Sequence, residues 1–246
     1  MYTEFADIYD TLMSDVEYDK WADFFEDIFK RNGTKPDLVL DLGCGTGTLT
    51  KIMAQRGYDM TGVDSSFSML NIAQMKGGNI LYLCQDMTEF ELYGTMGAIV
   101  SSLDCINYIT DDKALKKVLF LVHNYLDYDG VFIFDINTPY KLEKILGENT
   151  FVSDENGVFY TWESEFNNDS KLCDFYLTFF AEDKDGRYER IDEEQTERAW
   201  DPKELIKLLA ETGFSDIEVF GDKRFEEPKK DEERIFIKAV KREKKQ

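Results

Sequence analysis

The sequence has few of the residues that build disulfide frameworks and metal sites. Among its 246 residues there are only four cysteines and one histidine. The cysteines are Cys44, Cys84, Cys105 and Cys173, and no two of them form a CxxC pair. They are too few and too scattered for a disulfide framework or a zinc site, so we expect no metal and a reducing, cytoplasmic compartment.

Long apolar runs and basic residues are also scarce. No segment is apolar for long enough to span a bilayer, and residues 1–7 lack the basic and apolar stretches of a signal peptide, so no membrane association is expected. The chain has 29 basic against 50 acidic residues, a net charge of −21. A surface of this charge repels phosphate backbones, which argues against a nucleic-acid partner.

The basic residues that are present gather near the end of the sequence. Five of them, interleaved with glutamates, are Lys238, Lys241, Arg242, Lys244 and Lys245. We interpret this cluster as a solvated, frayed terminus.

Strand-like and helix-like segments alternate through the first half of the chain. Short apolar runs suggest strands at residues 38–42, 60–64, 80–84, 98–102 and 131–136. Helical spacing fills the gaps between them, including a long helix expected at residues 111–128. This alternation predicts an α/β fold with a doubly wound, mostly parallel sheet and helices on both faces.

Two stretches depart from the alternation. An aromatic helix ends at Asn32-Gly33 before the first strand. After the fifth strand and a short helix near residues 139–146, residues 151–200 lose helical spacing and contain two turns, at 167–170 and 183–186. Three extended stretches around these turns predict an antiparallel β-meander. A helix and two late strands, at 217–220 and 235–240, return to the α/β pattern.

A glycine-rich loop is the strongest motif. Asp41-Leu42-Gly43-Cys44-Gly45-Thr46-Gly47 lies between a predicted strand and a predicted helix, where glycines let a ligand approach the backbone. A plain strand-to-helix turn would explain these glycines alone. Asp64, however, ends the next strand, where a carboxylate can accept the hydrogen bonds of both ribose hydroxyls. The combination favours a nucleoside-binding site.

The loop fits one nucleoside cofactor better than another. A dinucleotide fingerprint needs a third glycine, and the two possible positions hold Thr48 and Thr50. A dinucleotide also brings an anionic pyrophosphate to a very acidic protein. S-adenosylmethionine has no phosphate and carries a sulfonium cation, so a glycine loop flanked by Asp41 suits it better.

The same residues resemble the signature loop of class I S-adenosylmethionine-dependent methyltransferases, which implies a Rossmann-like core. In that family Asp41 and the loop from Gly43 to Gly47, including Cys44 and Gly45, would surround the methionine moiety. Residues 63–70 are similar to the second motif of the family, and residues 84–87 to the third. The second motif implies that Asp64 holds the ribose while Ser65 and Met69 flank the adenosine. The third implies that Asp86 accepts the adenine amino group and Met87 packs nearby.

Two further segments extend the resemblance. Residues 102–104, with Leu103 at their centre, match the position that passes under the sulfonium. The aromatic N-terminus, from Tyr2 through Tyr9 to Tyr18 and Trp21, is similar to small-molecule methyltransferases, including those that dimethylate amino sugars. There it would fold over the cofactor, with Tyr9, Tyr18 and Trp21 as contacts. Packing of the N-terminal helix on the sheet is the alternative interpretation of these rings.

The meander is part of the same resemblance, because those relatives carry it as a roof over the acceptor. Some have a histidine where Gln195 aligns, so a histidine base does not carry over to this chain. Candidates for the acceptor site are three residues after the fourth strand and two in the meander: Asp104, Asn107, Tyr108, Trp162 and Arg198. A helix-capping turn is the alternative explanation for the first three.

These observations predict methyl transfer from S-adenosylmethionine to a small-molecule acceptor by in-line displacement. Proximity and exclusion of water would be its main catalytic effects, with no catalytic residue assigned. Alternatives are a non-enzymatic protein that binds S-adenosylmethionine and an NAD(P)-dependent oxidoreductase. The acceptor and the oligomeric state are left open. His123, late in the helix at 111–128, is expected far from the strand ends where ligands bind.

The expected organisation is one domain over residues 1–246. It comprises an N-terminal helical cover at 1–33, a cofactor-binding core at 34–136, an inserted β cap at 137–200 and a C-terminal part of the core at 201–246.

Overall fold

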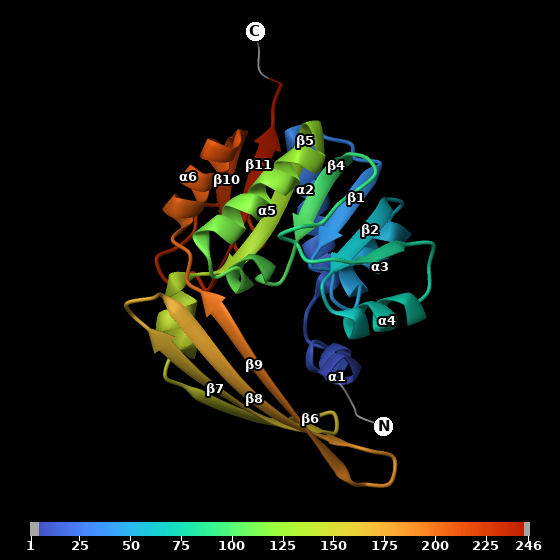
Figure 1. Ribbon diagram of the computed structural model, residues 1–246, viewed down its shortest axis with the longest axis vertical. Helices are drawn as coiled ribbons and strands as arrows, with labels where there is room; N and C mark the ends of the chain where they lie inside the picture. Colours follow the sequence, from blue (N-terminus) through green and yellow to red (C-terminus); the bar gives the residue numbers. More distant parts are fainter. Residues whose placement is uncertain (1–4, 244–246) are drawn as a thin grey trace.

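A seven-stranded sheet and a separate four-stranded sheet form the framework of the protein (Figure 1). The computed structural model describes residues 5–243, so Tyr2, Lys244 and Lys245 lie outside the described residues. The strand order of the large sheet is β10-β11-β5-β4-β1-β2-β3. Its strands are β1 (Leu38–Leu42), β2 (Asp59–Asp64), β3 (Leu81–Cys84), β4 (Met96–Ser101), β5 (Leu126–Asn137), β10 (Phe214–Gly221) and β11 (Arg234–Lys241).

Strands β1 to β5 pair in parallel, and only β11 runs antiparallel to its neighbours, β5 and β10. This is the doubly wound, mostly parallel sheet that the sequence predicts. The carboxyl ends of β1 to β5 therefore meet at one edge, where ligands bind in sheets of this type.

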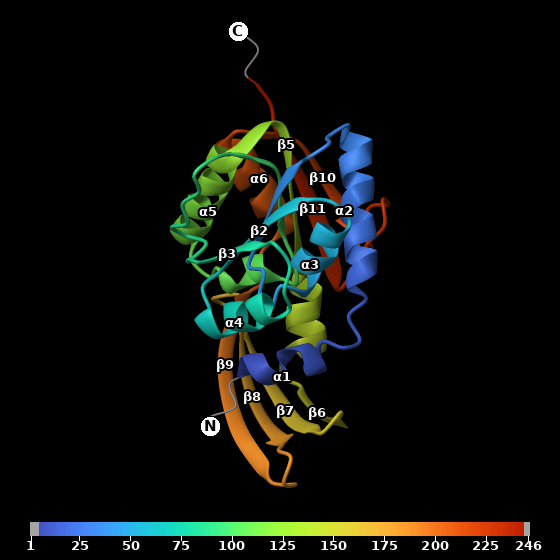
Figure 2. The same cartoon turned by 90° about the vertical axis from the view of Figure 1, so that its right-hand side faces the viewer.

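Helices cover both faces of the large sheet (Figure 2). On one face lie α2 (Tyr18–Asn32) and α3 (Thr48–Gln55), and on the other α5 (Asp112–Tyr125) and α6 (Pro202–Thr212). Each pair buries its apolar stripe against the sheet, so the protein has one hydrophobic core on each face. The helix α4 (Phe67–Met75) packs beside β2 and β3. No helix among residues 5–243 is both long and apolar enough to cross a membrane.

Two sequence predictions about local structure are wrong. The helix expected to reach residue 128 ends at Tyr125, and Leu126 already belongs to β5. The basic cluster is also not wholly a frayed terminus, because Lys238 and Lys241 lie in β11. Lys238 is buried and its ammonium pairs with Glu218, since β11 lies inside the sheet and both of its faces are covered.

The second sheet forms an antiparallel cap after β5, as predicted, but with four strands rather than three. They are β6 (Thr150–Glu155), β7 (Val158–Asn167), β8 (Leu172–Glu182) and β9 (Tyr188–Arg198). The missed strand, β6, pairs with β7 across Asn156-Gly157, where both residues have positive φ. An Asn-Gly pair with this backbone is the usual two-residue hairpin turn, so the sequence did contain a signal for β6.

One face of the cap is turned toward the rest of the protein, and we call it the inner face. Alternate residues of β7, β8 and β9 lie on it. Half of it packs on α1 (Phe5–Leu12) and the other half on the π-helical turn η2 (Lys141–Leu146). Figure 1 shows α1 between the cap and the large sheet. The inner face includes Val158, Tyr160, Trp162, Ser164, Phe166, Cys173, Phe175, Leu177, Phe179, Ala181, Ile191, Glu193, Gln195 and Glu197.

Candidate functional site

The glycine loop between β1 and α3 has a conformation that other residues rarely adopt. Gly43, Gly45 and Gly47 all have positive φ, at 82°, 52° and 70°. A Cβ on Gly43 would lie 2.6 Å from the sulfur of Cys105, and one on Gly47 would lie 2.6 Å from the hydroxyl of Tyr82. A Cβ on Gly45 would meet nothing within 4 Å. Packing therefore requires glycine at the two ends of the loop, while its middle faces open space.

Asp64 at the end of β2 stabilises this loop. Its Oδ2 accepts a hydrogen bond from the Gly45 amide and its Oδ1 one from the Ser66 amide, each at 2.8 Å. Because each carboxylate oxygen has two lone pairs, Asp64 keeps the capacity to accept two more hydrogen bonds. Asp64 and Ser65 both line a pocket, so this capacity is available to a ligand.

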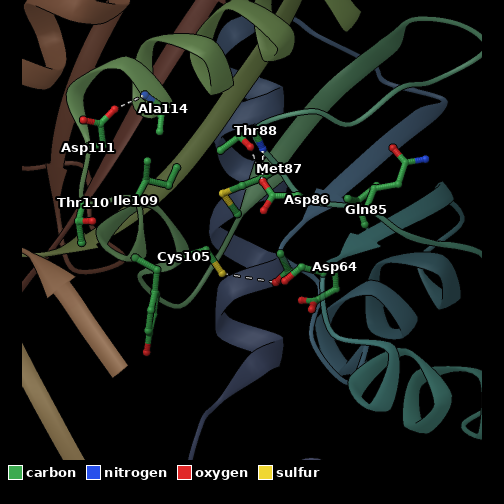
Figure 3. A pocket seen from close by; sticks show the side chains of 14 residues that line it. Asp64, Gln85, Asp86, Met87, Thr88, Cys105, Ile109, Thr110, Asp111 and Ala114 are labelled. Atoms are coloured by element: carbon green, nitrogen blue, oxygen red, sulfur yellow. Dashed lines mark hydrogen bonds between the residues drawn. The ribbon is translucent and has the colours of Figure 1, made fainter. Parts of the chain in front are cut away.

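The pocket has a volume of about 480 Å³ and lies at the carboxyl ends of β1 to β4 (Figure 3). Asp86 and Met87 line it as the sequence predicts, and Figure 3 shows them next to Thr88. Asp86 accepts hydrogen bonds from the Thr88 amide and hydroxyl at 2.7 and 2.6 Å, which lower the pKa of its carboxyl. The lining residues are Gly43, Val63, Asp64, Ser65, Gln85, Asp86, Met87, Thr88, Cys105, Tyr108, Ile109, Thr110, Asp111 and Ala114.

The charge of the pocket distinguishes between the candidate cofactors. Asp64, Asp86 and Asp111 line it, and no lysine or arginine is among the lining residues that the structure describes. Beneath the loop, the buried Asp41 accepts a hydrogen bond from the Thr50 hydroxyl at 2.6 Å, but its Oδ1 has no partner within residues 5–243. Burial raises the pKa of Asp41 to about 6. These residues fit the sulfonium of S-adenosylmethionine and do not fit a pyrophosphate.

Three predicted cofactor contacts come from the N-terminal helices. Burial raises the pKa of the Tyr9 and Tyr18 hydroxyls, and the neighbouring Tyr18 adds to the rise at Tyr9. Asp10 fixes α1 to the loop, since it accepts a 2.6 Å hydrogen bond from Thr46 and forms an ion pair with Lys76. Trp21 lies deeper, in the core between α2 and β11, with its ring 5.0 Å from that of Phe236. Its contacts match the packing interpretation.

The remaining predicted cofactor residues lie around the same loop. Met69 is in the first turn of α4, and its amide donates to the N-cap hydroxyl of Ser66 at 3.3 Å. Cys44 is half-buried in the loop itself, where a Cβ on Gly62 would approach its sulfur to 2.9 Å. Leu103 follows β4 and packs against the core on the α2 side. The fold thus brings the three predicted motifs and the end of β4 to one edge of the sheet.

The chain bends sharply after β4. Leu103 and Asp104 are consecutive residues with φ of 60° and 56°, a conformation that is unfavourable for both side chains. Asp135 of β5 accepts a 3.0 Å hydrogen bond from the Asp104 amide, and Arg234 of β11 pairs with the carboxylates of both aspartates. Arg234 therefore stabilises the bend. The sequence contained a weak signal for it, a charge at the start of the apolar run of β11.

The predicted acceptor residues after β4 have different surroundings. Asn107, in the short helix η1 (Cys105–Tyr108), is fully buried, and its amide donates to the Asn137 and Arg198 carbonyls and accepts from the Asn137 amide, each at 3.0 Å. These hydrogen bonds connect η1, β5 and β9, so the contacts of Asn107 serve the structure of the protein. The Tyr108 hydroxyl donates to Gln195 Oε1 of the cap at 2.9 Å, and Tyr108 also lines the pocket, so it joins the pocket to the inner face.

The two predicted residues of the cap lie on opposite faces. Trp162 lies on the inner face against Phe175, and its buried Nε1 has no partner within residues 5–243. Arg198 contacts the start of α5 instead, where it donates to the Thr110 carbonyl and pairs with Asp112, at 3.0 and 2.9 Å. The Arg198 side chain therefore connects the cap to α5 and does not lie on the inner face.

Comparisons with known proteins agree with this geometry. Residues 39–130 match a family model described as a methyltransferase domain. A protein of Geobacillus sp. (strain WCH70) described as a methyltransferase is 32% identical over 245 residues, which cover 98% of this chain and 99% of that protein. The solved structure of an S-adenosylmethionine-dependent methyltransferase from Clostridium acetobutylicum is 36% identical, with a TM-score of 0.89 over 97% of this chain and 98% of that one. The chain belongs to the S-adenosylmethionine-dependent methyltransferase family.

A more distant structure has the same fold. The sugar N-methyltransferase KedS8 from Streptoalloteichus sp. is 20% identical, with a TM-score of 0.82 over 99% of this chain and 95% of that one. The family membership confirms the predicted enzyme class, and the cofactor of this methyltransferase is S-adenosylmethionine. This membership sets aside the two alternatives that the sequence left open, a non-enzymatic binding protein and an oxidoreductase.

Sequence reasoning also missed a buried carboxylate next to the predicted acceptor residues. Glu197 lies on the inner face of the cap, is 3% exposed, and its Oε2 accepts a hydrogen bond from Asn137 Nδ2 at 2.9 Å. The only signal in the sequence was the alternation of β9, which puts Glu197 on the same face as Gln195.

Proposed function

We propose that this methyltransferase acts on a small-molecule acceptor bound between the pocket and the inner face of the cap. The hydrogen bond from Tyr108 to Gln195 is the observation that carries the proposal, because it joins the wall of the cofactor pocket to the roof. A roof over the strand ends favours a compact acceptor. The net charge of −21 further argues against a nucleic-acid acceptor. The likeness in fold to a sugar N-methyltransferase supports the same class of acceptor.

The cofactor would be held by the residues that the sequence motifs single out. In this proposal Asp64 accepts the hydrogen bonds of the ribose hydroxyls, and Asp86 and Met87 contact the adenine. The loop from Gly43 to Gly47 and the charge of Asp41 lie against the methionine moiety. Tyr9 and Tyr18 cover it from the N-terminal side. When bound, S-adenosylmethionine supplies a methyl group activated by the positive sulfonium.

The protein's own contribution to the reaction would be alignment and exclusion of water. Leu103 and Asp104, fixed after β4 by Arg234, would set the surface on which the reacting atoms meet. The cap and α1 would exclude water from an in-line displacement. Alignment of two reactants can contribute several kcal/mol to lowering such a barrier.

The test is release of S-adenosylhomocysteine from wild-type protein with a panel of small metabolites, compared with bulk RNA and protein as acceptors. Trp162→Ala, on the inner face, should leave S-adenosylmethionine affinity unchanged and alter kcat/KM for the acceptor. Tyr176→Ala, on the exposed outer face of β8, is the matched control and should change neither. Release with macromolecules alone, or loss of cofactor affinity in a folded Trp162→Ala protein, would contradict the proposal.

A further inference from the structure

Buried acidic groups outnumber basic groups on the acceptor side of the pocket. Asp135 is fully buried, Glu197 is 3% exposed, and the side chain of Asp104 is 15% exposed. Two cations lie among these three carboxylates. Arg234 pairs with both aspartates, whereas the Lys141 ammonium donates to Asn137 Oδ1 at 2.9 Å. Within residues 5–243, Glu197 forms no ion pair, so one of the three carboxyl groups has no direct counterion when it ionises.

The position of Glu197 is fixed by a short chain of hydrogen bonds. Asn137 donates to Glu197, and Asn107 in turn holds the backbone of Asn137. Glu197 is two residues from Gln195 on the same face of β9, and Gln195 bonds to Tyr108 of the pocket wall. The carboxylate thus lies above the carboxyl ends of β4 and β5, beside the pocket.

The electrostatic surroundings of Glu197 make its carboxylate a better base than an exposed one. Burial, and the neighbouring charge of Asp104, raise its pKa well above the usual range, while the hydrogen bond from Asn137 and the charges of Lys141 and Arg234 act in the opposite direction. Cys173 is the direct partner of Glu197 across β8 and β9. The charge of Glu197 helps to raise the pKa of both Tyr108 and Cys173. The groups that face Glu197 are therefore Asp104 and Tyr108 after β4, Cys173 of β8, Lys141 of η2 and Arg234 of β11.

A buried carboxylate without a counterion destabilises a protein by several kcal/mol unless another group compensates it. A cation on the acceptor would compensate Glu197 at the place where methyl transfer is proposed to occur. We propose that the acceptor is a basic amine and that Glu197 takes the proton from its ammonium group, an inference that rests on the small-molecule function proposed above.

The chemistry balances without any further reactant. The ammonium transfers one proton to the Glu197 carboxylate, which leaves a neutral amine and a carboxylic acid. The nitrogen lone pair then forms the N–C bond to the methyl group as the C–S bond breaks. The electron pair of the C–S bond stays on sulfur. The products are a methylated ammonium and a neutral thioether, and Glu197 later releases its proton to solvent.

An amine suits this base better than a hydroxyl does. The pKa of an ordinary alkylammonium is about 10.4, within reach of a carboxylate whose own pKa is raised. Water, as a guide to hydroxyl acceptors, has a pKa of about 15.7. A carboxylate would therefore deprotonate an ammonium to a useful extent and a hydroxyl hardly at all.

The first experiment compares matched acceptors. Release of S-adenosylhomocysteine is measured with glucosamine against glucose, and with a series of primary amines against the alcohols of the same carbon skeleton. We expect turnover with amines only. Turnover with alcohols but not amines overturns this inference and leaves the small-molecule function intact. Turnover with neither class, despite normal cofactor binding, overturns both.

The second experiment uses Glu197→Gln, which keeps the shape and an oxygen to accept from Asn137. With the best amine, kcat/KM near pH 7 should fall at least about a hundredfold, the lower range for loss of a general base. The loss should shrink to less than about tenfold near pH 10, where the amine deprotonates in solution. Glu194→Gln, the same change on the exposed outer face of β9, should have no effect.

A purely structural role for Glu197 would give a different result. The loss in Glu197→Gln would then be equal at all pH values and would accompany a lower melting temperature. Such a pH-independent loss, or unchanged turnover in the variant, overturns the inference.

Discussion

The carboxylates on the two sides of the site are held by different kinds of partner. On the side that we propose for the cofactor, Asp64 and Asp86 accept hydrogen bonds from backbone amides two residues away or in the loop after the adjacent strand. On the side that we propose for the acceptor, Asp104 and Asp135 are held by the guanidinium of Arg234, which lies 130 residues beyond Asp104. Glu197 comes from yet another element, the last strand of the cap.

This difference predicts which property a substitution on each side will change, ligand binding or the stability of the fold. Backbone amides keep their position when a side chain is replaced, so a change on the cofactor side should affect binding and leave the fold intact. A buried ion pair between distant strands is part of the tertiary structure, so a change there should affect stability as well. Four substitutions test this contrast.

The largest effect is expected from Asp64→Ala on the cofactor side. The variant should lose at least about a hundredfold in S-adenosylmethionine affinity, because two charge-assisted hydrogen bonds to the ribose contribute roughly 1.5–3 kcal/mol each. Isothermal titration calorimetry measures the loss. Asp59→Ala, at the exposed opposite end of β2, is the matched control and should bind normally. Wild-type affinity in Asp64→Ala would remove Asp64 from the site.

Next in size is Arg234→Met on the acceptor side. Removing the guanidinium leaves two buried carboxylates without a counterion, so the free energy of unfolding should fall by about 3–5 kcal/mol in denaturant titrations. Arg242→Met is the control, since its ion pairs with Asp129 and Asp216 are exposed and should contribute at most about 1 kcal/mol. If Arg234→Met unfolds like the wild type, the contrast between the two sides is wrong.

The same contrast explains how much could be predicted from the sequence. The glycine loop and Asp64 contact each other at neighbouring strand ends, so periodicity and spacing were enough to place them at one edge. Asp86 was assigned from the resemblance to the third motif of the family. The mostly parallel sheet and the insertion of the cap after the fifth strand followed from the alternation of strands and helices along the chain.

The acceptor side could not be predicted in this way. Nothing near Asp104 in the sequence points to Arg234, and the role of Glu197 depends on how the cap folds back over β5. Arg198, which was expected near the acceptor, turns to α5 because successive residues of β9 face opposite sides. Contacts between distant elements decide these positions, and a single sequence does not encode them in a readable pattern.

A third substitution concerns Asp41, a buried carboxylate that within residues 5–243 accepts its hydrogen bond from the Thr50 hydroxyl rather than from a backbone amide. Its pKa is raised from 3.8 to about 6, so the folded state favours the protonated form and loses stability as pH rises between these values. Asp41→Asn removes this titration. Its free energy of unfolding should rise relative to wild type by roughly 2–3 kcal/mol between pH 4 and pH 7. A difference that stays constant over this range in denaturant titrations would contradict the assignment.

The smallest effect is expected at His123, which belongs to neither side. It lies near the C-terminal end of α5, with its ring 5.1 Å from that of Phe214 at the start of β10. Because β10 runs parallel to β5, its start lies at the edge of the sheet opposite the pocket. Proton transfer needs hydrogen-bond reach or one bridging water, so this imidazole cannot serve the reaction.

His123→Gln should therefore retain turnover within about twofold of wild type, in the same assay and with the same pH profile that tests Glu197→Gln. Any pH dependence would then come from the acceptor or from a carboxylate rather than from the imidazole, although an unperturbed histidine titrates near neutrality. A hundredfold loss in a stably folded His123→Gln protein would mean that the reaction depends on the opposite edge of the sheet. The division of the site into a cofactor side and an acceptor side, both at the carboxyl ends of the strands, would then be wrong.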